Sequence, residues 1–198
     1  MPRVLRPVAL ALTLTTLTGA CSLFGRSGAS TTPTPASGGA NASAPALSDA
    51  NIAAIVVAAN NADIMYADLA LAKSQDAEVR GFATMTKKDH QSVNEAAVAL
   101  VTKLKVTPVD NQVSFDLRDD AETKRLVMRD LEGFAFDSAY AANEVTYHRT
   151  VLGAIDAALI PSAQNAELKA LLVSVRPAVA AHLEHASALA AKKTVRSR

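Results

Sequence analysis

Apolar residues recur at intervals of three and four positions from about residue 49 to residue 192. That interval is the period of an amphipathic α-helix, whereas strands would show strict alternation. The pattern predicts four long helices, over about 49–73, 77–104, 134–159 and 164–192. It also predicts a shorter, more polar helix over 116–130, which precedes or splits the third long one. Because the links are short, we expect an all-α, up-and-down antiparallel four-helix bundle.

Turn-forming residues and prolines mark the limits of these helices. Ser74-Gln75-Asp76 is typical of a turn followed by an N-cap, and residues 106–116 form the longest break. Pro161 is expected to stop the third long helix. Pro177 lies inside the last one, where a missing N–H group should kink the helix.

The amino terminus has the pattern of a secretory signal. Residues 1–20 hold two arginines, a short apolar stretch and small residues, and the stretch is too short to span a membrane. Cys21, the only cysteine of the chain, follows at once. The segment LTGAC resembles the bacterial lipoprotein box, in which this cysteine carries the lipid; an incidental cysteine after an ordinary signal is the alternative. Ser22, by the rule known for enteric lipoproteins, favours the outer membrane, with the protein facing the periplasm.

The rest of the chain divides by composition. Residues 21–47 contain the cysteine and a Ser/Thr/Pro/Gly/Ala-rich linker that is expected to be disordered. Residues 48–192 form the predicted bundle, and residues 193–198 are a basic tail. The whole chain has 20 basic and 19 acidic residues, so a nucleic-acid partner is not indicated. The sequence predicts one partner, the membrane, to which a lipid on Cys21 would attach the protein. It does not indicate a protein partner.

Several motifs occur together and in a fixed order within the predicted bundle. They are the segment 62–74, Asp89-His90 with Asn94, Phe136-Asp137 with Tyr140 and His148, and Pro177 with His182-Leu183. Together they resemble a widespread bacterial family of envelope proteins of unknown function, often labelled membrane or outer-membrane proteins. The resemblance covers about residues 48–190. It implies a ferritin-like four-helix domain and an envelope location, without an established activity.

The resemblance also implies a set of recurrent polar residues, with one departure in the first helix. The set comprises Asp89, His90, Asp137, Tyr140, His148 and His182. Family members often have a glutamate where this chain has Met65. Asp63 lies two positions earlier, which turns a helical side chain by about 200°. We therefore do not expect Asp63 to replace that glutamate, and its loss would weaken a metal site that needed it.

Histidines and acidic residues on three of the long helices form the candidate site. Glu144 and His148 are four positions apart, so they share one helix face. Such residues on facing helices could hold zinc or iron. They could equally form a buried polar layer in which they hydrogen-bond to one another. We expect the layer, without a cofactor, before the metal site. The candidate residues are His90, Asp137, Tyr140, Glu144, His148, His182 and His185.

Catalytic motifs are missing from the sequence. Di-iron ferritin-like proteins carry Glu-x-x-His on two helices, and this chain has no such pair, so ferroxidase chemistry is not expected. The chain also lacks a nucleophile elbow and a phosphate-binding glycine loop. The sequence thus favours a non-enzymatic envelope lipoprotein with a structural or interaction domain. The alternative is a periplasmic metal-binding protein that serves metal buffering or stress protection.

Overall fold

The computed structural model describes residues 47–195, in which the backbone forms helices and no strand. The predicted signal, Cys21, almost all of the linker and the end of the tail lie outside these residues. The long helices are α1 (Asp49–Lys73), α2 (Ala77–Leu104), α3 (Gln112–Arg129), α4 (Gly133–Ala154) and α6 (Ala166–Val195). A π-helical turn, η1 (Ile155–Leu159), and a short helix, α5 (Ile160–Ser162), connect α4 to α6. The prediction of an all-α protein is confirmed.

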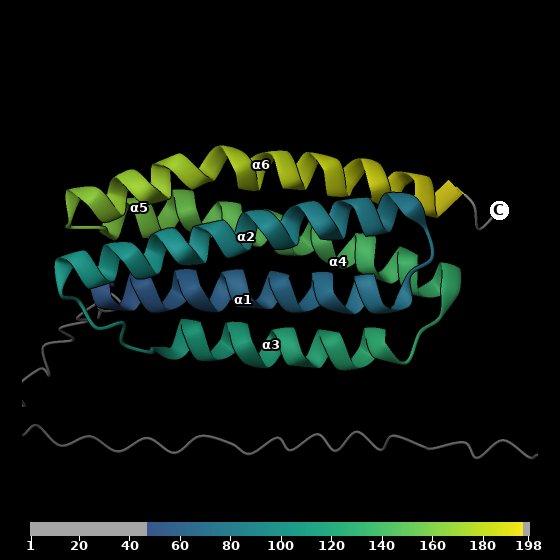
Figure 1. Ribbon diagram of the computed structural model, residues 1–198, viewed down its shortest axis with the longest axis horizontal. Coiled ribbons are helices and arrows are strands. Elements are labelled where there is room, and N and C mark those ends of the chain that lie inside the picture. The colour runs from purple at the N-terminus through teal and green to yellow at the C-terminus, as the bar shows by residue number, and fades with distance from the viewer. Residues whose placement is uncertain (1–46, 196–198) are drawn as a thin grey trace, which may run out of the picture. The chain divides into compact units, whose positions relative to one another are not determined.

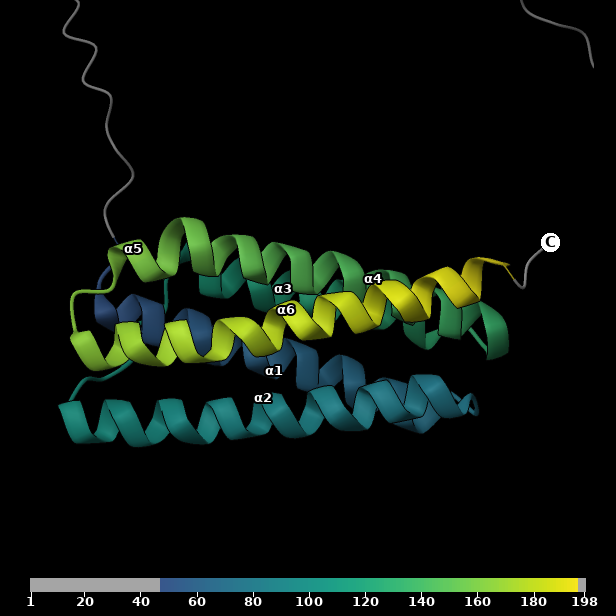
Figure 2. The ribbon, with the colours of Figure 1, turned by 90° about the horizontal axis from the view of Figure 1, so that it is seen from above.

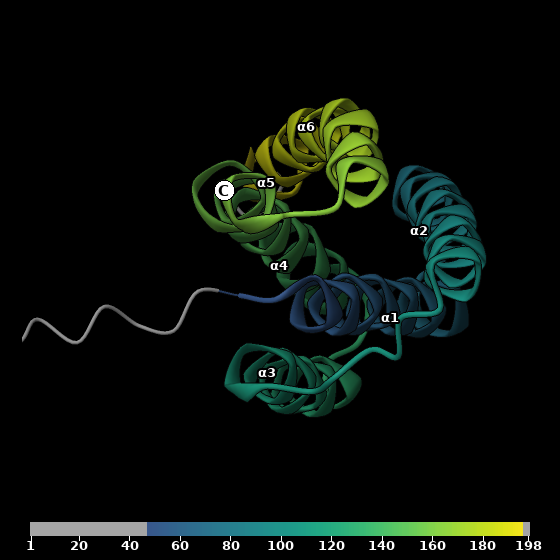
Figure 3. The same cartoon turned by 90° about the vertical axis from the view of Figure 1, so that its left-hand side faces the viewer.

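Four of the long helices enclose a common core, and the fifth lies outside it. Seen end-on in Figure 3, α1, α2, α6 and α4 surround the core, while α3 lies against the outer side of α1. Figure 2 shows α6 between α4 and α2, in agreement with its contacts to both. Helix α1 is therefore covered on two sides.

Successive long helices run in opposite directions (Figure 1). Since α3 carries the chain back along the core, α2 and α4 run in the same direction, diagonally across from each other (Figures 1 and 3). The simple up-and-down order predicted for the four core helices is therefore wrong at this step. The sequence predicted a shorter helix that precedes or splits the third long one; the structure has it as the separate helix α3, and its packing on the outside of α1 was not predicted.

Local sequence explains where the helices begin and end. Ser48 caps α1 by accepting the N–H of Asn51, whose side chain reaches back to the Ser48 N–H. Asp76 accepts the N–H groups of two residues in the first turn of α2. Gly133 begins α4 with a φ of +53°, a conformation that glycine adopts without strain.

Of the two prolines, Pro161 acts differently from what the sequence predicted, and Pro177 leaves the prediction open. The helical run does not stop before Pro161 but continues to Ser162 through the wider π turn. There, the N–H of Ile160 bonds to the carbonyl of Ile155, five residues earlier. Pro161 has no N–H to donate, and the π turn accommodates it without ending the helix. Helix α6 continues on both sides of Pro177, and the kink there stays a prediction.

The core consists of two apolar clusters separated along the helices by polar side chains. One cluster is built around Tyr66, Phe82 and Tyr140, and the other around Ile52 and Leu172. His90 on α2, His148 on α4 and His182 on α6 fall between the parts of their helices that supply these two clusters, while Asp63 and Glu144 lie among residues of the first cluster. Helix α1 is long and apolar enough to cross a membrane, but 61% of its most apolar window is buried within the protein, as in a core helix. The polar layer is thus positioned by all four core helices.

Candidate metal centre

A compact group of buried polar side chains crosses the middle of the core. Asp63 comes from α1, His90 from α2, Glu144 and His148 from α4, and His182 from α6, and none is more than 5% exposed. One ring nitrogen from each of the three histidines lies within 4.8 Å of those of the other two. Ligand atoms of Asp63, Glu144 and His148 meet the same criterion, so His148 belongs to both groups. We call these five residues the central cluster.

Each imidazole of the central cluster is held by an oxygen acceptor outside the cluster's centre. His90 Nδ1 lies 2.7 Å from Asn60 Oδ1, and His182 Nε2 lies 2.9 Å from Asp89 Oδ2. His148 Nδ1 lies 3.0 Å from the backbone carbonyl oxygen of Glu144. Because these oxygens accept, the three ring nitrogens carry the protons. The opposite nitrogens, His90 Nε2, His148 Nε2 and His182 Nδ1, have lone pairs and no hydrogen-bond partner among the described residues.

The two carboxyl groups of the central cluster lie against these imidazoles without well-oriented hydrogen bonds. Asp63 Oδ2 is 3.2 Å from His90 Nε2, and Asp63 Oδ1 is 3.8 Å from His148 Nε2. Glu144 Oε2 is 3.3 Å from His148 Nδ1. None of the four carboxyl oxygens has a well-oriented hydrogen bond within residues 47–195, although the two carboxyl groups lie beside each other and beside the hydroxyls of Thr86 and Tyr140. Buried polar atoms are normally satisfied, so such a concentration indicates a bound group or shared protons.

Burial controls the protonation of the central cluster. It raises the pKa of Asp63 well above its usual value, with the neighbouring Glu144 charge adding to the rise. It raises the pKa of Glu144 to about 8 and lowers that of His90 to about 3. Burial also lowers the pKa of His182. At neutral pH the imidazoles of His90 and His182 are therefore neutral, the form that binds metals, while the carboxyl groups favour their protonated form unless a cation is near.

No lysine or arginine in the described part of the chain forms an ion pair with Asp63 or Glu144. The one buried lysine there, Lys193, pairs with Asp76. A protein-derived positive charge is therefore missing from the central cluster. A metal cation would fill that role.

The structure brings four of the seven predicted site residues together: His90, Glu144, His148 and His182. Tyr140 is buried one turn before Glu144. Its ring belongs to an apolar cluster, with Phe82 and Phe136 ring centroids 6.2 Å away, and its hydroxyl lies beside the Glu144 carboxyl.

The other two predicted site residues lie apart from these four. Asp137 is buried elsewhere, and its carboxyl oxygen accepts a hydrogen bond from Ser74 at 2.5 Å. His185 is exposed, and its ring contacts Phe82 edge-on at 5.1 Å.

Sequence reasoning missed two residues of the candidate site: Asp63 of the central cluster, and Asn60, which holds the His90 ring. Asp63 was not expected to replace the glutamate that family members often have at position 65, yet Asp63 is fully buried in the central cluster, and Met65 is half-buried against an apolar cluster. Asn60 and Asp63 are three positions apart on one helix face and are the buried amide and carboxyl side chains of α1. Two polar residues at that spacing were the available signal.

Comparison with known families gives one result. Residues 34–189 match a family described as a domain of unknown function, DUF4142. Comparisons with curated proteins and with solved structures give no significant match. The match spans most of the chain and includes the whole central cluster, and we conclude that the chain belongs to the DUF4142 family.

Proposed function

We propose that this domain binds a divalent transition-metal ion, zinc or iron(II), at the central cluster. One observation carries the proposal: three buried imidazoles each have one N–H held by an oxygen acceptor and no well-oriented hydrogen bond at the other nitrogen, and one ring nitrogen of each lies within 4.8 Å of those of the other two. Metal-binding histidines are usually oriented in this way, because the outer hydrogen bond fixes the tautomer and the ring. Imidazole ligands suit zinc, iron, copper and nickel.

The charge of the central cluster supports the same proposal. Two carboxylates buried without cationic side chains are costly in free energy, and in the absence of a metal they hold protons instead. A divalent cation would offset the charge of both Asp63 and Glu144. Binding would then release protons and weaken as the pH falls. A purely structural layer would leave seven buried atoms without a well-oriented hydrogen bond, whereas a bound metal ion would give those atoms a common partner.

The proposed role is binding rather than turnover, with metal buffering or stress protection as the outcome. The donor set lacks the paired Glu-x-x-His motifs of the di-iron carboxylate proteins, so ferroxidase activity is not proposed. We also propose that the four core helices are a ferritin-like bundle. This proposal is supported by the long connection through α3, which makes α2 and α4 parallel. One long crossover connection is typical of ferritin-like bundles.

We further propose that the domain is held at the outer membrane, facing the periplasm, by a lipid on Cys21. The support is the sequence of the signal and of the segment LTGAC, both outside the described residues. The non-enzymatic lipoprotein expected from the sequence is thereby kept, and metal binding becomes the task of its domain.

Thermal unfolding with and without metal tests the proposal. Zinc, or iron(II) without oxygen, should raise the Tm of chelator-treated wild type. At a metal concentration of about 100 times Kd, the gain is about 2.7 kcal/mol. For a domain of this size that gain corresponds to roughly 5–10 °C. His148→Ala should abolish the response, whereas His185→Ala, an exposed histidine on α6, should keep it. A wild-type Tm that neither metal changes would instead support the structural layer.

A further inference from the structure

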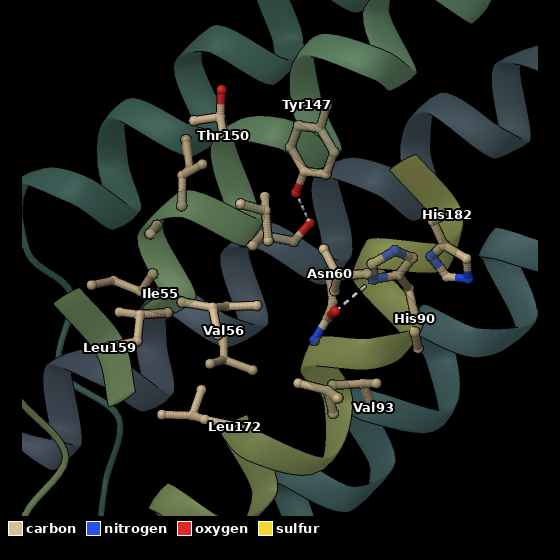
Figure 4. A pocket seen from close by; sticks show the side chains of 18 of the residues that line it. Ile55, Val56, Asn60, His90, Val93, Tyr147, Thr150, Leu159, Leu172 and His182 are labelled. Atoms are coloured by element: carbon tan, nitrogen blue, oxygen red, sulfur yellow. Dashed lines mark hydrogen bonds between the residues drawn. The ribbon is translucent and has the colours of Figure 1, made fainter. Parts of the chain in front are cut away.

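An apolar pocket adjoins the central cluster on the side of the second apolar cluster. It encloses about 150 Å³ and is lined by residues of α1, α2, α3, α4, η1 and α6. Figure 4 shows side chains of Ile55, Val56, Val93, Leu159 and Leu172 around it. Its surface consists almost entirely of carbon atoms. A pocket of this kind offers burial to an apolar molecule and few hydrogen bonds.

One end of the pocket is formed by two imidazoles of the central cluster. His90 and His182 both line it, and Figure 4 shows them side by side at that end. Two of the polar groups nearby are used within the protein: Asn60 Oδ1 accepts from His90, and the Tyr147 hydroxyl donates to the carbonyl of Ala59. Single nitrogens of Asn60, His90 and His182 have no hydrogen-bond partner among the described residues, but the rest of the wall is almost entirely carbon. A charged ligand would therefore lose its hydration and gain few partners from the wall.

The π-helical turn η1 forms part of the wall. Ile155 and Leu159, its first and last residues, both line the pocket and are both buried. Single π turns within helices often occur at functional sites, because they displace side chains from the regular helical positions. The irregular backbone of η1 therefore forms part of the wall of this pocket.

We propose that this pocket binds a small neutral apolar molecule, of about the size of an aromatic ring, and holds it against His90 and His182. The volume supports the size, since an apolar cavity of about 150 Å³ binds benzene or xenon. The carbon-lined wall supports the lack of charge. The inference is independent of metal binding and applies equally to the chelator-treated protein.

Benzene and benzoate, added to chelator-treated protein, are suitable probes. Benzene should raise the Tm of wild type, and benzoate, of similar size but charged, should not. Ala154→Leu, which places a larger side chain in the pocket wall, should abolish the benzene response. Ala178→Leu fills the pocket from α6 and should do the same, and as Ala178 is exposed this variant is expected to fold. Ala142→Leu, an exposed position of α4 outside the pocket, is the matched control and should respond like wild type.

Proton NMR of the imidazole rings locates the ligand. Benzene should shift the signals of His90 and His182, which line the pocket, and leave that of the exposed His185 unchanged. A wild type without a benzene response, or one in which both filled variants respond as strongly as the control, would overturn the proposal. Benzoate that binds as well as benzene would overturn the neutral-ligand assignment. Loss of metal binding in His148→Ala leaves this test unaffected, because His148 does not line the pocket.

Discussion

Replacing Glu144 by glutamine should make the metal-free protein less sensitive to rising pH. Glu144 is fully buried, and burial raises the pKa of its carboxyl from 4.5 to about 8. Between these two values the folded protein holds a proton that the unfolded chain has released. Unfolding is therefore favoured as the pH rises, and the free energy of unfolding falls until the pH passes the folded-state pKa. Glutamine has a similar shape and does not titrate.

The histidines set the pH window in which this effect dominates. Burial lowers the pKa of His90 from 6.5 to about 3, so the free energy of unfolding falls as the pH drops towards and below 6.5. At pH 6.5 this histidine is half protonated in the unfolded chain, which opposes the carboxyl effect by only about 0.4 kcal/mol, and the opposition disappears by pH 8. From pH 6.5 to pH 8, Glu144 removes about 1.5 kcal/mol of stability at 1.36 kcal/mol per pKa unit. Asp63, whose pKa is also raised, contributes in the same direction.

Urea unfolding at pH 6.5, 7 and 8 in the presence of a chelator measures this decline. Wild type should lose stability across the window, and Glu144→Gln should lose about 1.5 kcal/mol less. Glu122→Gln is the matched control, because Glu122 is exposed on α3 and pairs with Arg125, and it should follow wild type. A wild type whose stability is constant or rises from pH 6.5 to pH 8 would refute the reasoning. So would a Glu144→Gln variant that declines as steeply as wild type.

Three further predictions concern the outer hydrogen bonds of the imidazoles, the buried carboxylate of Asp137 and the lipid anchor. Asn60→Leu removes an imidazole's acceptor and should weaken zinc binding about 10- to 100-fold in a chelator-competition titration, whereas Asn61→Leu, exposed and adjacent, should not. Asp137→Ala leaves buried Ser74 without its partner and should cost about 1–3 kcal/mol in urea unfolding, with unchanged zinc affinity. Cys21→Ser should move the protein from the membrane to the soluble fraction; mass spectrometry that finds wild type without an acylated Cys21 would contradict the lipoprotein assignment.

The helices were predictable from the sequence because their signals are local. Periodicity, the turn at Ser74-Gln75-Asp76 and the break over 106–116 gave limits close to those of α1 and α2. The place of α3 was not predictable, because nothing in its own amphipathic pattern states which helix it covers. Helix α1 packs against α3 as well as its core neighbours, so it is apolar on more than one face.

The same property of α1 explains why part of the central cluster was missed. In a helix that is apolar on several faces, the sequence does not indicate which side points to the other core helices. Asp63 was therefore judged only by its distance from Met65. The histidines were easier to identify, because His90, His148 and His182 all belong to the motifs that carry the family resemblance. The ring tautomers, on which the metal proposal depends, follow only from the positions of oxygen acceptors such as Asn60 Oδ1.

The most direct measurement of metal binding at the central cluster is anomalous X-ray diffraction at the zinc edge, on crystals of the chelator-treated protein soaked in zinc. The account predicts one strong peak inside the core, about 2.0–2.1 Å from His90 Nε2, His148 Nε2 and His182 Nδ1. A carboxyl oxygen of Asp63 or Glu144 should complete the coordination. Zinc found only at surface residues, with the three imidazoles unchanged, would contradict the account.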